Sequence, residues 1–334
     1  MHSSSSAPMP PVMQKDWTLL ALHPGCKINL NLRITGTRPD GYHLLDSVFL
    51  ALDKPCDTMH LAPAKSGGLT VSCTEDGIDC QKNSLTKAWT LFAEKTGFAP
   101  SLHCELVKGI PWGAGLGGGT SDAAALLSFL QAQARAEGIS VAQKDLMDIG
   151  TKVGADVPFF LSKAKCCRVQ GIGEILEELA PGAIKLPGEY LVLAMPRTRV
   201  STPWAYKAYD DLLRDAKRCD EGAEKAQNAP PERSSRQFRP CPDKTLTDQK
   251  RADKENVPQH RTVELFLNDL EGPVFREYPE LGQIKDTLLQ LGACVASMSG
   301  SGSCIFGIFA EYSKAHAVAD VLDCPVQICH LTGM

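Results

Sequence analysis

The sequence lacks the features that are typical of a membrane-spanning protein, a nucleic-acid-binding protein or a protein with a structural metal site. It has no uninterrupted apolar run of membrane length, and its beginning does not resemble a signal peptide. Its formal net charge of -4 offers no basic excess for nucleic acid or an anionic membrane. Its 13 cysteines lack paired C-x2-C spacings, since Cys166 and Cys167 are adjacent and Cys324 and Cys329 lie too far apart. We therefore expect a cytoplasmic protein with reduced thiols, without a membrane or nucleic-acid partner and without a protein-held metal.

The length of 334 residues exceeds that of most single domains and favours two domains with one cleft between them. We expect a disordered tail over residues 1–17, an N-terminal domain over 18–170 and a C-terminal domain over 171–334. Residues 215–260 have few branched aliphatics, several prolines and mixed charges, which predicts a disordered insertion. An anion-binding arm is the alternative, but acidic residues are interspersed and aromatics do not alternate with the basic ones. We favour a solvated loop without a catalytic role.

The middle of the N-terminal half predicts a strand, a loop and a helix in direct succession. Apolar residues alternate with polar ones over Ser101–Ile110, as in a half-buried strand. Helical spacing follows over Ser121–Glu137 and is ended by Gly138. An earlier helix is predicted from Ser84 to a stop at Gly97.

The loop between that strand and that helix reads PWGAGLGGGTSD, from Pro111 to Asp122. Glycines allow positive φ and close backbone approach, and a helix N-terminus adds unpaired N–H donors, so this arrangement indicates a phosphate or nucleotide site. The loop also satisfies G-x-G-x-x-G, but no second parallel strand ending in an acidic residue follows, as a dinucleotide fold requires. The P-loop pattern G-x-x-x-x-G-K-[ST] is absent. A glycine-rich turn without a ligand is the alternative for this loop taken alone.

A second glycine-rich segment, Met298–Ser303, lies between two apolar runs near the end of the chain. Alone it is typical of a hairpin turn between two strands.

Three segments in this order resemble the three motifs of the galactokinase, homoserine, mevalonate and phosphomevalonate (GHMP) kinase superfamily. They are PGCKINL at Pro24–Leu30, the glycine loop, and the late turn Ser299–Ser303. The resemblance implies an α+β fold of two domains, the first like domain 2 of ribosomal protein S5 and the second ferredoxin-like. It also implies ATP, with Mg²⁺ arriving on the nucleotide, as the phosphoryl donor.

Within the superfamily, three further segments resemble the family that phosphorylates 4-diphosphocytidyl-2-C-methyl-D-erythritol on its 2-hydroxyl group, a step in isoprenoid precursor synthesis. They are RPDGYH at Arg38–His43, GADVPFF at Gly154–Phe160 and NDLE at Asn268–Glu271. The chain departs from the family at Cys26, where alanine is usual, and at Thr120, where serine is usual. Both replacements are small.

Lys27 and Asp156 are the catalytic candidates that this resemblance implies. Lys27 lies in an apolar strand-like run, where a buried ammonium needs a carboxylate or phosphate partner, and Asp156 is the candidate partner. Asp156 would orient or deprotonate the acceptor hydroxyl, and Lys27 would stabilise developing negative charge. The alternatives are an ordinary helix cap for Asp156 and a lysine at a strand edge for Lys27.

The resemblance also implies the residues that bind each substrate. Tyr42 would stack on the cytosine and His43 would bind its edge, with Tyr206 as a second aromatic or else a core residue. The residues expected around the acceptor are Asn29, Tyr42, His43, Tyr206, Gly300, Ser301 and Gly302. Those expected around ATP are Pro111, Gly113, Gly115, Leu116, Gly117, Gly118, Gly119, Thr120, Ser121, Asn83 and Lys108, with Thr120 or Ser121 as a contact for Mg²⁺. For Asn83 and Lys108 the alternatives are a helix cap and a solvated lysine.

Two other functions stay open from the sequence. One is another kinase of the superfamily, such as a homoserine or mevalonate kinase, from which the Tyr42–His43 pair would distinguish this chain. The other is a catalytically silent metabolite sensor that keeps the fold. Small molecules are the expected partners, and the chain is expected to act as a monomer or weak homodimer.

Overall fold

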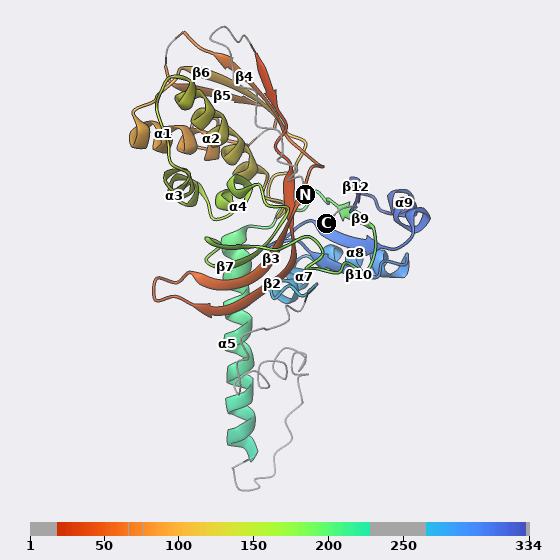
Figure 1. Ribbon diagram of the computed structural model, residues 1–334. Coiled ribbons are helices and arrows are strands. Elements are labelled where there is room, and N and C mark those ends of the chain that lie inside the picture. Colours follow the sequence, from red (N-terminus) through yellow and green to blue (C-terminus); the bar gives the residue numbers. More distant parts are fainter. Residues whose placement is uncertain (1–18, 66, 76, 228–264, 332–334) are drawn as a thin grey trace.

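The computed structural model describes residues 19–65, 67–75, 77–227 and 265–331 (Figure 1). The described strands form three four-stranded sheets, in the orders β1-β4-β6-β5, β2-β3-β7-β8 and β10-β11-β9-β12. The tail expected over residues 1–17 lies outside the described residues. None of the described helices is long and apolar enough to cross a bilayer.

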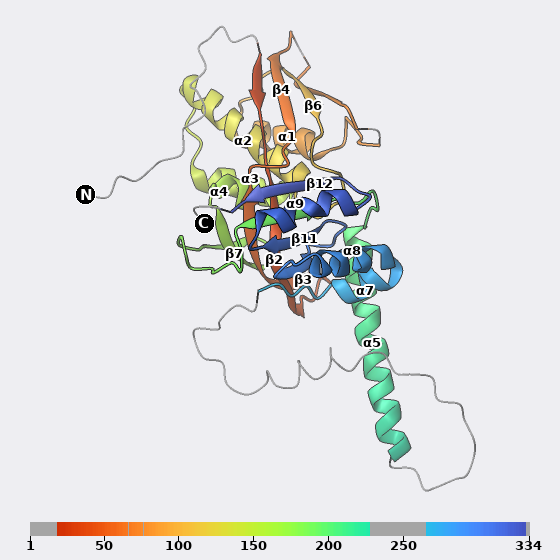
Figure 2. The same cartoon turned by 90° about the vertical axis from the view of Figure 1, so that its right-hand side faces the viewer.

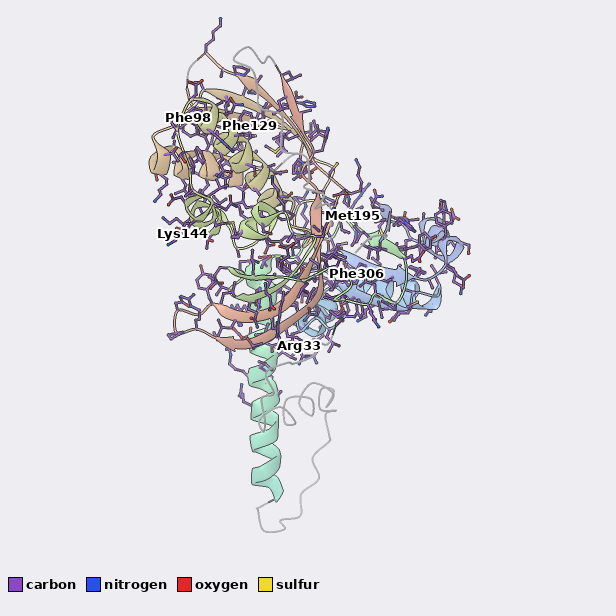
Figure 3. All side chains as sticks on the ribbon, in the orientation of Figure 1. Arg33, Phe98, Phe129, Lys144, Met195 and Phe306 are labelled. Carbon is purple, nitrogen blue, oxygen red and sulfur yellow. The ribbon has the colours of Figure 1, made fainter. Side chains whose placement is uncertain are left out.

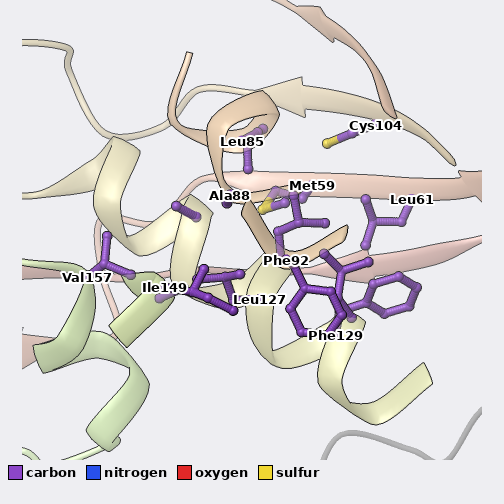
Figure 4. Close-up of a cluster of buried hydrophobic side chains, with 14 of the residues drawn as sticks. Met59, Leu61, Leu85, Ala88, Phe92, Cys104, Leu127, Phe129, Ile149 and Val157 are labelled. Carbon is purple, nitrogen blue, oxygen red and sulfur yellow. The ribbon is translucent and has the colours of Figure 1, made fainter. Parts of the chain in front are cut away.

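The first sheet is covered by a layer of helices, α1 to α4 (Figure 1). Its strands are β1 (Leu20–Leu22), β4 (Thr58–Pro63), β5 (Leu69–Cys73) and β6 (Leu102–Val107). The helices are α1 (Ser84–Thr96), α2 (Gly118–Ala136), α3 (Gln143–Val153) and α4 (Val157–Ser162). The expected alternation over Ser101–Ile110 is confirmed, because β6 buries every second side chain against the helices. Figure 4 shows this core, with Phe92 of α1 packed near Leu127 and Phe129 of α2.

Both helices predicted from spacing are present, but α2 begins earlier than expected. α1 ends at Gly97, which has the left-handed conformation expected of a stop. α2 begins at Gly118 rather than Ser121, with Gly117 as its N-cap at φ +72°. The last two glycines of the loop, Gly118 and Gly119, therefore belong to the first turn of the helix. The left-handed conformation of Gly117 lets the helix begin three residues before the predicted start.

The second sheet consists of β2 (Cys26–Thr37), β3 (His43–Leu52), β7 (Cys166–Gly171) and β8 (Ile175–Glu178). β2 and β3 form a long antiparallel hairpin with irregularities after Asn29 and Ile34. Because β7 and β8 pair with each other, the expected boundary between residues 170 and 171 falls inside a hairpin. We propose that the two domains divide after Glu178 instead.

The third sheet is antiparallel and carries helices on one face (Figure 2). It consists of β9 (Tyr190–Ala194), β10 (Val295–Met298), β11 (Ile305–Phe309) and β12 (Val326–His330), with α7 (Glu271–Glu277), α8 (Pro279–Gln290) and α9 (Tyr312–Val321). Its other face packs on the second sheet, where Phe306 and Met195 share a core with Ile28 and Leu50. Figure 3 labels Phe306 and Met195 in this region. This shared core fixes the position of one domain on the other.

Helix α5 (Thr202–Gln227) begins at the domain junction, packs against α7 and then extends away from the body (Figures 1 and 2). It runs past Asp215, where the sequence predicts the insertion to begin, so residues 215–227 are helical. Alanine, lysine, arginine and glutamate dominate this stretch, and these are strong helix formers even where few apolar side chains are available for burial. The rest of the expected insertion, residues 228–260, lies outside the described residues.

Candidate active site

A cleft of about 690 Å³ lies where the glycine loop, strand β2, helix α5 and the late glycine turn meet. Most of the candidate residues line it. These are Lys27, Asn29, Asn83, Lys108, Pro111, Gly113, Gly115, Leu116, Gly117, Gly118, Gly119, Thr120, Asp156, Tyr206, Gly300 and Ser301. Among the residues that the structure describes, Ser121, Tyr42, His43 and Gly302 do not line the cleft.

The glycine loop ends in backbone N–H groups that have no hydrogen-bond partner among the described residues. The first intrahelical bond of α2 runs from the N–H of Ser121 to the carbonyl oxygen of Gly117 at 2.9 Å. The N–H groups of Gly118, Gly119 and Thr120 precede that bond, so they belong to the helix N-terminus, where donors and the helix dipole favour an anion. Ser121, which the sequence proposed for ATP, is only 4% exposed and faces the core.

The late glycine turn holds the glycine loop in place. The hydroxyl of Ser299 donates to the carbonyl oxygen of Gly115 at 3.1 Å, and the N–H of Cys304 donates to the carbonyl oxygen of Ala114 at 3.1 Å. Gly115 has φ +74°, and a side chain there would collide with the carbonyl oxygen of Ser299. The turn is therefore a brace for the loop as well as part of the cleft wall.

Asn268 and Glu271, which the sequence singled out only as motif members, hold that turn from behind. The amide of Asn268 donates to the carbonyl oxygens of Met298 and Gly300, both at 2.7 Å. The carboxylate of Glu271 accepts from the N–H of Met298 and the hydroxyl of Ser297, both at 2.8 Å. The NDLE segment is thus a support for the site.

Lys27 and Asp156 form an ion pair in the wall of the cleft. The ammonium of Lys27 lies 3.5 Å from Oδ2 of Asp156, donates to Oδ1 of Asn29 at 2.6 Å and lies 4.7 Å from the ring centre of Phe49. The Lys27 side chain is 5% exposed and that of Asp156 is 26% exposed. Asp156 occupies the N-cap position of α4, yet its side chain makes no capping bond within the described structure. The carboxylate is therefore directed to the lysine and the cleft.

Lys108 is not a solvated lysine, because it lies between two buried carboxylates. Its ammonium is 3.1 Å from Oδ2 of Asp122 and also pairs with Asp57, which in turn accepts the N–H groups of Gly109 and Ile110 at 2.8 Å each. Burial opposes the charge of Lys108, but the two carboxylates outweigh it and raise the pKa of Lys108. Burial and the neighbouring Asp57 raise the pKa of Asp122 to about 7, against the opposing effect of Lys108. Oδ1 of Asp122 has no hydrogen-bond partner among the described residues.

This three-residue cluster was missed by sequence reasoning. Asp122 was counted only as the end of the glycine loop, although a carboxylate within the apolar side of a predicted helix signals a buried partner. Asp57 gave no signal, because it comes from a loop far away in the sequence.

Asn83 and Thr120 line the cleft with side chains that already have local partners. Oδ1 of Asn83 accepts the N–H groups of Leu85 at 2.9 Å and Thr86 at 3.0 Å, and Asn83 forms a capping box with Thr86. The hydroxyl of Thr120 donates to the carbonyl oxygen of Gly117 at 2.8 Å, which leaves its oxygen lone pairs for another ligand.

The expected base-binding residues lie beside the cleft, at the junction of the β2–β3 hairpin and α5. Tyr42 is 61% exposed near the tip of the hairpin. The ring of His43 stacks on that of Tyr206, with centroids 4.9 Å apart, and its Nε2 lies 2.8 Å from a carboxylate oxygen of Asp210. Burial, with a smaller effect of Asp156, raises the pKa of Tyr206, so its hydroxyl stays protonated. Asp210 was missed by sequence reasoning.

Two family models match the chain. The one described as GHMP kinases N terminal domain matches residues 83–164, and the one described as GHMP kinases C terminal matches residues 257–326. The first stretch contains the glycine loop and Asp156, and the second contains the late glycine turn.

Curated relatives extend the similarity over most of the chain. A protein of Lawsonia intracellularis named 4-diphosphocytidyl-2-C-methyl-D-erythritol kinase is 41% identical over 298 residues, which are 89% of this chain and 90% of that protein. A protein of the same name from Oleidesulfovibrio alaskensis is 42% identical over 309 residues, 88% of this chain and 91% of that protein.

Solved structures share the fold. A crystal structure of 4-(cytidine 5'-diphospho)-2C-methyl-D-erythritol kinase superimposes with a TM-score of 0.63 at 30% identity, covering 92% of this chain and 98% of that one. The homoserine kinase of Cytophaga hutchinsonii gives a TM-score of 0.58 at 15% identity, covering 96% of each chain, and shows similarity of fold alone. The expected two-domain α+β fold is thereby confirmed.

Proposed function

Because the chain belongs to the 4-diphosphocytidyl-2-C-methyl-D-erythritol kinase family of GHMP kinases, we propose that it transfers the γ-phosphoryl group of ATP to the 2-hydroxyl of that methylerythritol. The observation that carries this proposal is the position of Lys27 and Asp156 opposite the N-terminus of α2. A Cβ atom on Gly117 would lie 3.2 Å from Cγ of Lys27, so the lysine stem contacts the end of the anion-binding loop. A phosphoryl group on that loop is thus within reach of both side chains.

The N-terminus of α2 is the proposed site for the phosphates of ATP. Its free N–H groups need no reorganisation when an anion binds, because helix geometry already fixes them. The left-handed conformations of Gly113, Gly115 and Gly117 hold the loop open without side chains, at φ between +72° and +76°. This arrangement supports binding through the backbone rather than through a P-loop lysine.

Asp156 is the proposed group that orients and deprotonates the acceptor hydroxyl. Its carboxylate is partly exposed to the cleft and is not engaged in capping the helix that it starts. A carboxylate within hydrogen-bond reach of a hydroxyl aligns an oxygen lone pair with the phosphorus and accepts the proton as the new bond forms.

Lys27 is the proposed electrostatic partner of the transferred group. Its ammonium is nearly buried, so solvent screens its field only weakly, and Asn29 and Asp156 fix its position. It keeps the Asp156 carboxylate in place before reaction and stabilises negative charge on the phosphoryl oxygens during transfer.

The donor set in the cleft is suited to Mg²⁺ bound with the nucleotide. Thr120 and Asp156 offer a hydroxyl oxygen and a carboxylate oxygen, which are ligands that Mg²⁺ accepts beside phosphates and water. When bound, the ion would neutralise phosphate charge. The described residues contain no group of three or more His, Cys, Asp or Glu side chains placed to hold a metal, so the phosphates would supply much of the coordination.

The acceptor's cytosine is assigned to Tyr42, His43 and Tyr206, at the wall that α5 contributes. Tyr206 lines the cleft and Tyr42 is exposed on the neighbouring hairpin, so both supply aromatic surface beside the cleft for a base that enters from solvent. Eleven of the cysteines in the described part of the chain are free, which supports a reducing, cytoplasmic location.

Release of ADP, measured by a coupled assay across four acceptors, tests the proposal. The acceptors are 4-diphosphocytidyl-2-C-methyl-D-erythritol, mevalonate, homoserine and galactose. We expect ADP release with the first alone. Preferential turnover of another acceptor would assign the chain to a different reaction of the superfamily, and no turnover of any, with binding retained, would support a metabolite sensor.

A further inference from the structure

One face of helix α5 forms a cradle around the imidazole ring of His43. Tyr206, Tyr209 and Asp210 have the spacing i, i+3 and i+4, which places them on the same side of a helix. Tyr206 stacks on the imidazole at 4.9 Å, Tyr209 meets it edge-on at 6.4 Å, and Asp210 reaches Nε2 at 2.8 Å. Two rings and one carboxylate therefore fix both the plane of the imidazole and its rotation.

The carboxylate also determines which ring nitrogen carries the proton. An ionised carboxylate only accepts hydrogen bonds, so a neutral imidazole beside it must present N–H at Nε2. Its other nitrogen, Nδ1, is then left with a lone pair. Among the described residues no hydrogen bond is made to Nδ1, so its lone pair can accept one from a ligand that reaches this ring, whose side chain is 9% exposed.

We propose that Asp210 is a positioning residue that makes His43 select a cytosine over a uracil. Cytosine carries an exocyclic amino group, which donates a hydrogen bond, where uracil carries a carbonyl oxygen, which only accepts one. A fixed acceptor at Nδ1 can accept a hydrogen bond from the amino group of cytosine. With uracil, the lone pair of Nδ1 would face a lone pair of the carbonyl oxygen and be repelled. The inference rests on the proposed function, because it assumes that the base of the acceptor substrate contacts His43.

Asp210 is not among the residues that anchor α5 in the core. Its side chain is 38% exposed, whereas α5 is anchored by Ala205 and Tyr209, which are 0% and 1% exposed in the core of the C-terminal domain. A hydrogen bond to a carboxylate at that exposure contributes modestly to folding. The contact with His43 is thus best explained by its effect on the orientation and the tautomer of the imidazole.

Two variants and a neighbouring control separate this role from a structural one. Asp210→Ala removes the acceptor for Nε2, and Asp210→Asn keeps a side chain of equal size whose amide either accepts from or donates to the ring. Asp211→Ala is the control, since Asp211 is on the same helix, is 50% exposed and pairs with Arg214 at 2.8 Å. The full-length enzyme is assayed with ATP and with the cytidine and uridine forms of the acceptor.

We expect the ratio of kcat/KM for the cytidine form to that for the uridine form to fall about 10- to 100-fold in Asp210→Ala. The loss should come from a higher KM for the cytidine form, with kcat and the KM for ATP nearly unchanged. Asp210→Asn should recover part of the ratio, and Asp211→Ala should keep the wild-type value. A wild-type ratio in Asp210→Ala, or an equal loss in Asp211→Ala, would overturn the inference.

Nitrogen-15 NMR of the imidazole tests the same inference without substrate. The long-range spectrum of neutral His43, assigned with His43→Gln, should show the proton on Nε2 in the wild type and a mixture of both tautomers in Asp210→Ala. A proton on Nδ1 in the wild type would overturn the inference even if the enzyme is active. Failure of the wild type to phosphorylate the cytidine form would instead contradict the proposed function, which the spectrum does not measure.

Discussion

The ammonium of Lys27 and the carboxylate of Asp156 are 3.5 Å apart, although one belongs to a strand of the second sheet and the other to the start of a helix covering the first. Their contact therefore joins the second sheet to the helical layer of α1 to α4. It places a buried positive charge and a partly exposed negative charge side by side in the wall of the cleft that the N-terminus of α2 also lines.

Replacing Asp156 with Asn should lower kcat by about 10²- to 10⁴-fold while substrate affinities change little. Asparagine has the size of aspartate, but it accepts no proton and has no charge for Lys27. Because the Asp156 side chain makes no capping bond, the melting temperature should stay close to that of the wild type. Steady-state kinetics on folded protein measure the effect. Near-wild-type turnover would remove Asp156 from the mechanism.

Gly117→Ala should raise the KM for ATP and lower kcat together. Gly117 has φ +72°, and a Cβ atom there would lie 3.2 Å from both Cγ of Lys27 and a ring carbon of Phe160. The substitution thus strains the cap of α2 and displaces the lysine. Gly138→Ala is the matched control, because Gly138 has φ +80° with no atom within 4 Å of its Cβ position. It should cost stability through backbone strain alone, and equal kinetic losses in both variants would argue against the role of the loop.

Asn268→Ala should destabilise the protein by about 2–4 kcal/mol, because it leaves two buried carbonyl oxygens, those of Met298 and Gly300, without donors. Asn268→Asp keeps the shape and the acceptor for the N–H of Leu270 but also loses both donors, so it should be at least as destabilising. Urea unfolding of the two variants measures the change. A loss of under about 0.5 kcal/mol in both would show that the late glycine turn does not depend on this side chain.

Asp122→Asn should make stability less dependent on pH. The pKa of Asp122 rises from 3.8 to about 7 in the folded protein, chiefly through burial. Between these two values the native state binds a proton that the unfolded chain has released, so the free energy of unfolding falls as pH rises through this window. The asparagine variant has no such proton. Unfolding experiments from about pH 5 to about pH 8 should therefore show the wild type losing stability relative to the variant as pH rises, and parallel curves would contradict the assignment.

The parts of the site that the sequence predicted are those encoded in contiguous segments. The glycine loop could be found because its glycines, the preceding strand and the following helix are adjacent in the chain. Lys27 and Asp156 were found by resemblance, and their partnership was inferred from the cost of burying an unpaired ammonium. The conformation of Gly117, which moves the start of α2 to Gly118, could not be read from composition.

The parts that the sequence did not predict depend on contacts between distant segments. Asp57 meets Lys108 only because strands β4 and β6 pair, and Asp210 meets His43 only because α5 passes the end of the β2–β3 hairpin. No local pattern marks either contact. The helical extension of α5 was missed for another reason, since low apolar content predicts little burial but does not prevent a helix from forming.

The hydroxyl of Ser299 accepts the N–H of Asn29 at 3.2 Å and donates to Gly115, and this has a consequence for synthesis on the ribosome. The nascent chain emerges from its N-terminus, so the strand with Lys27 and the glycine loop leave the exit tunnel long before Ser299. Until then the loop lacks the two bonds that its Ala114 and Gly115 carbonyl oxygens receive from the late turn. A nascent chain that ends before Ser299 therefore carries the sequence motif for triphosphate binding without its braced conformation, and nucleotide capture awaits synthesis of the late glycine turn.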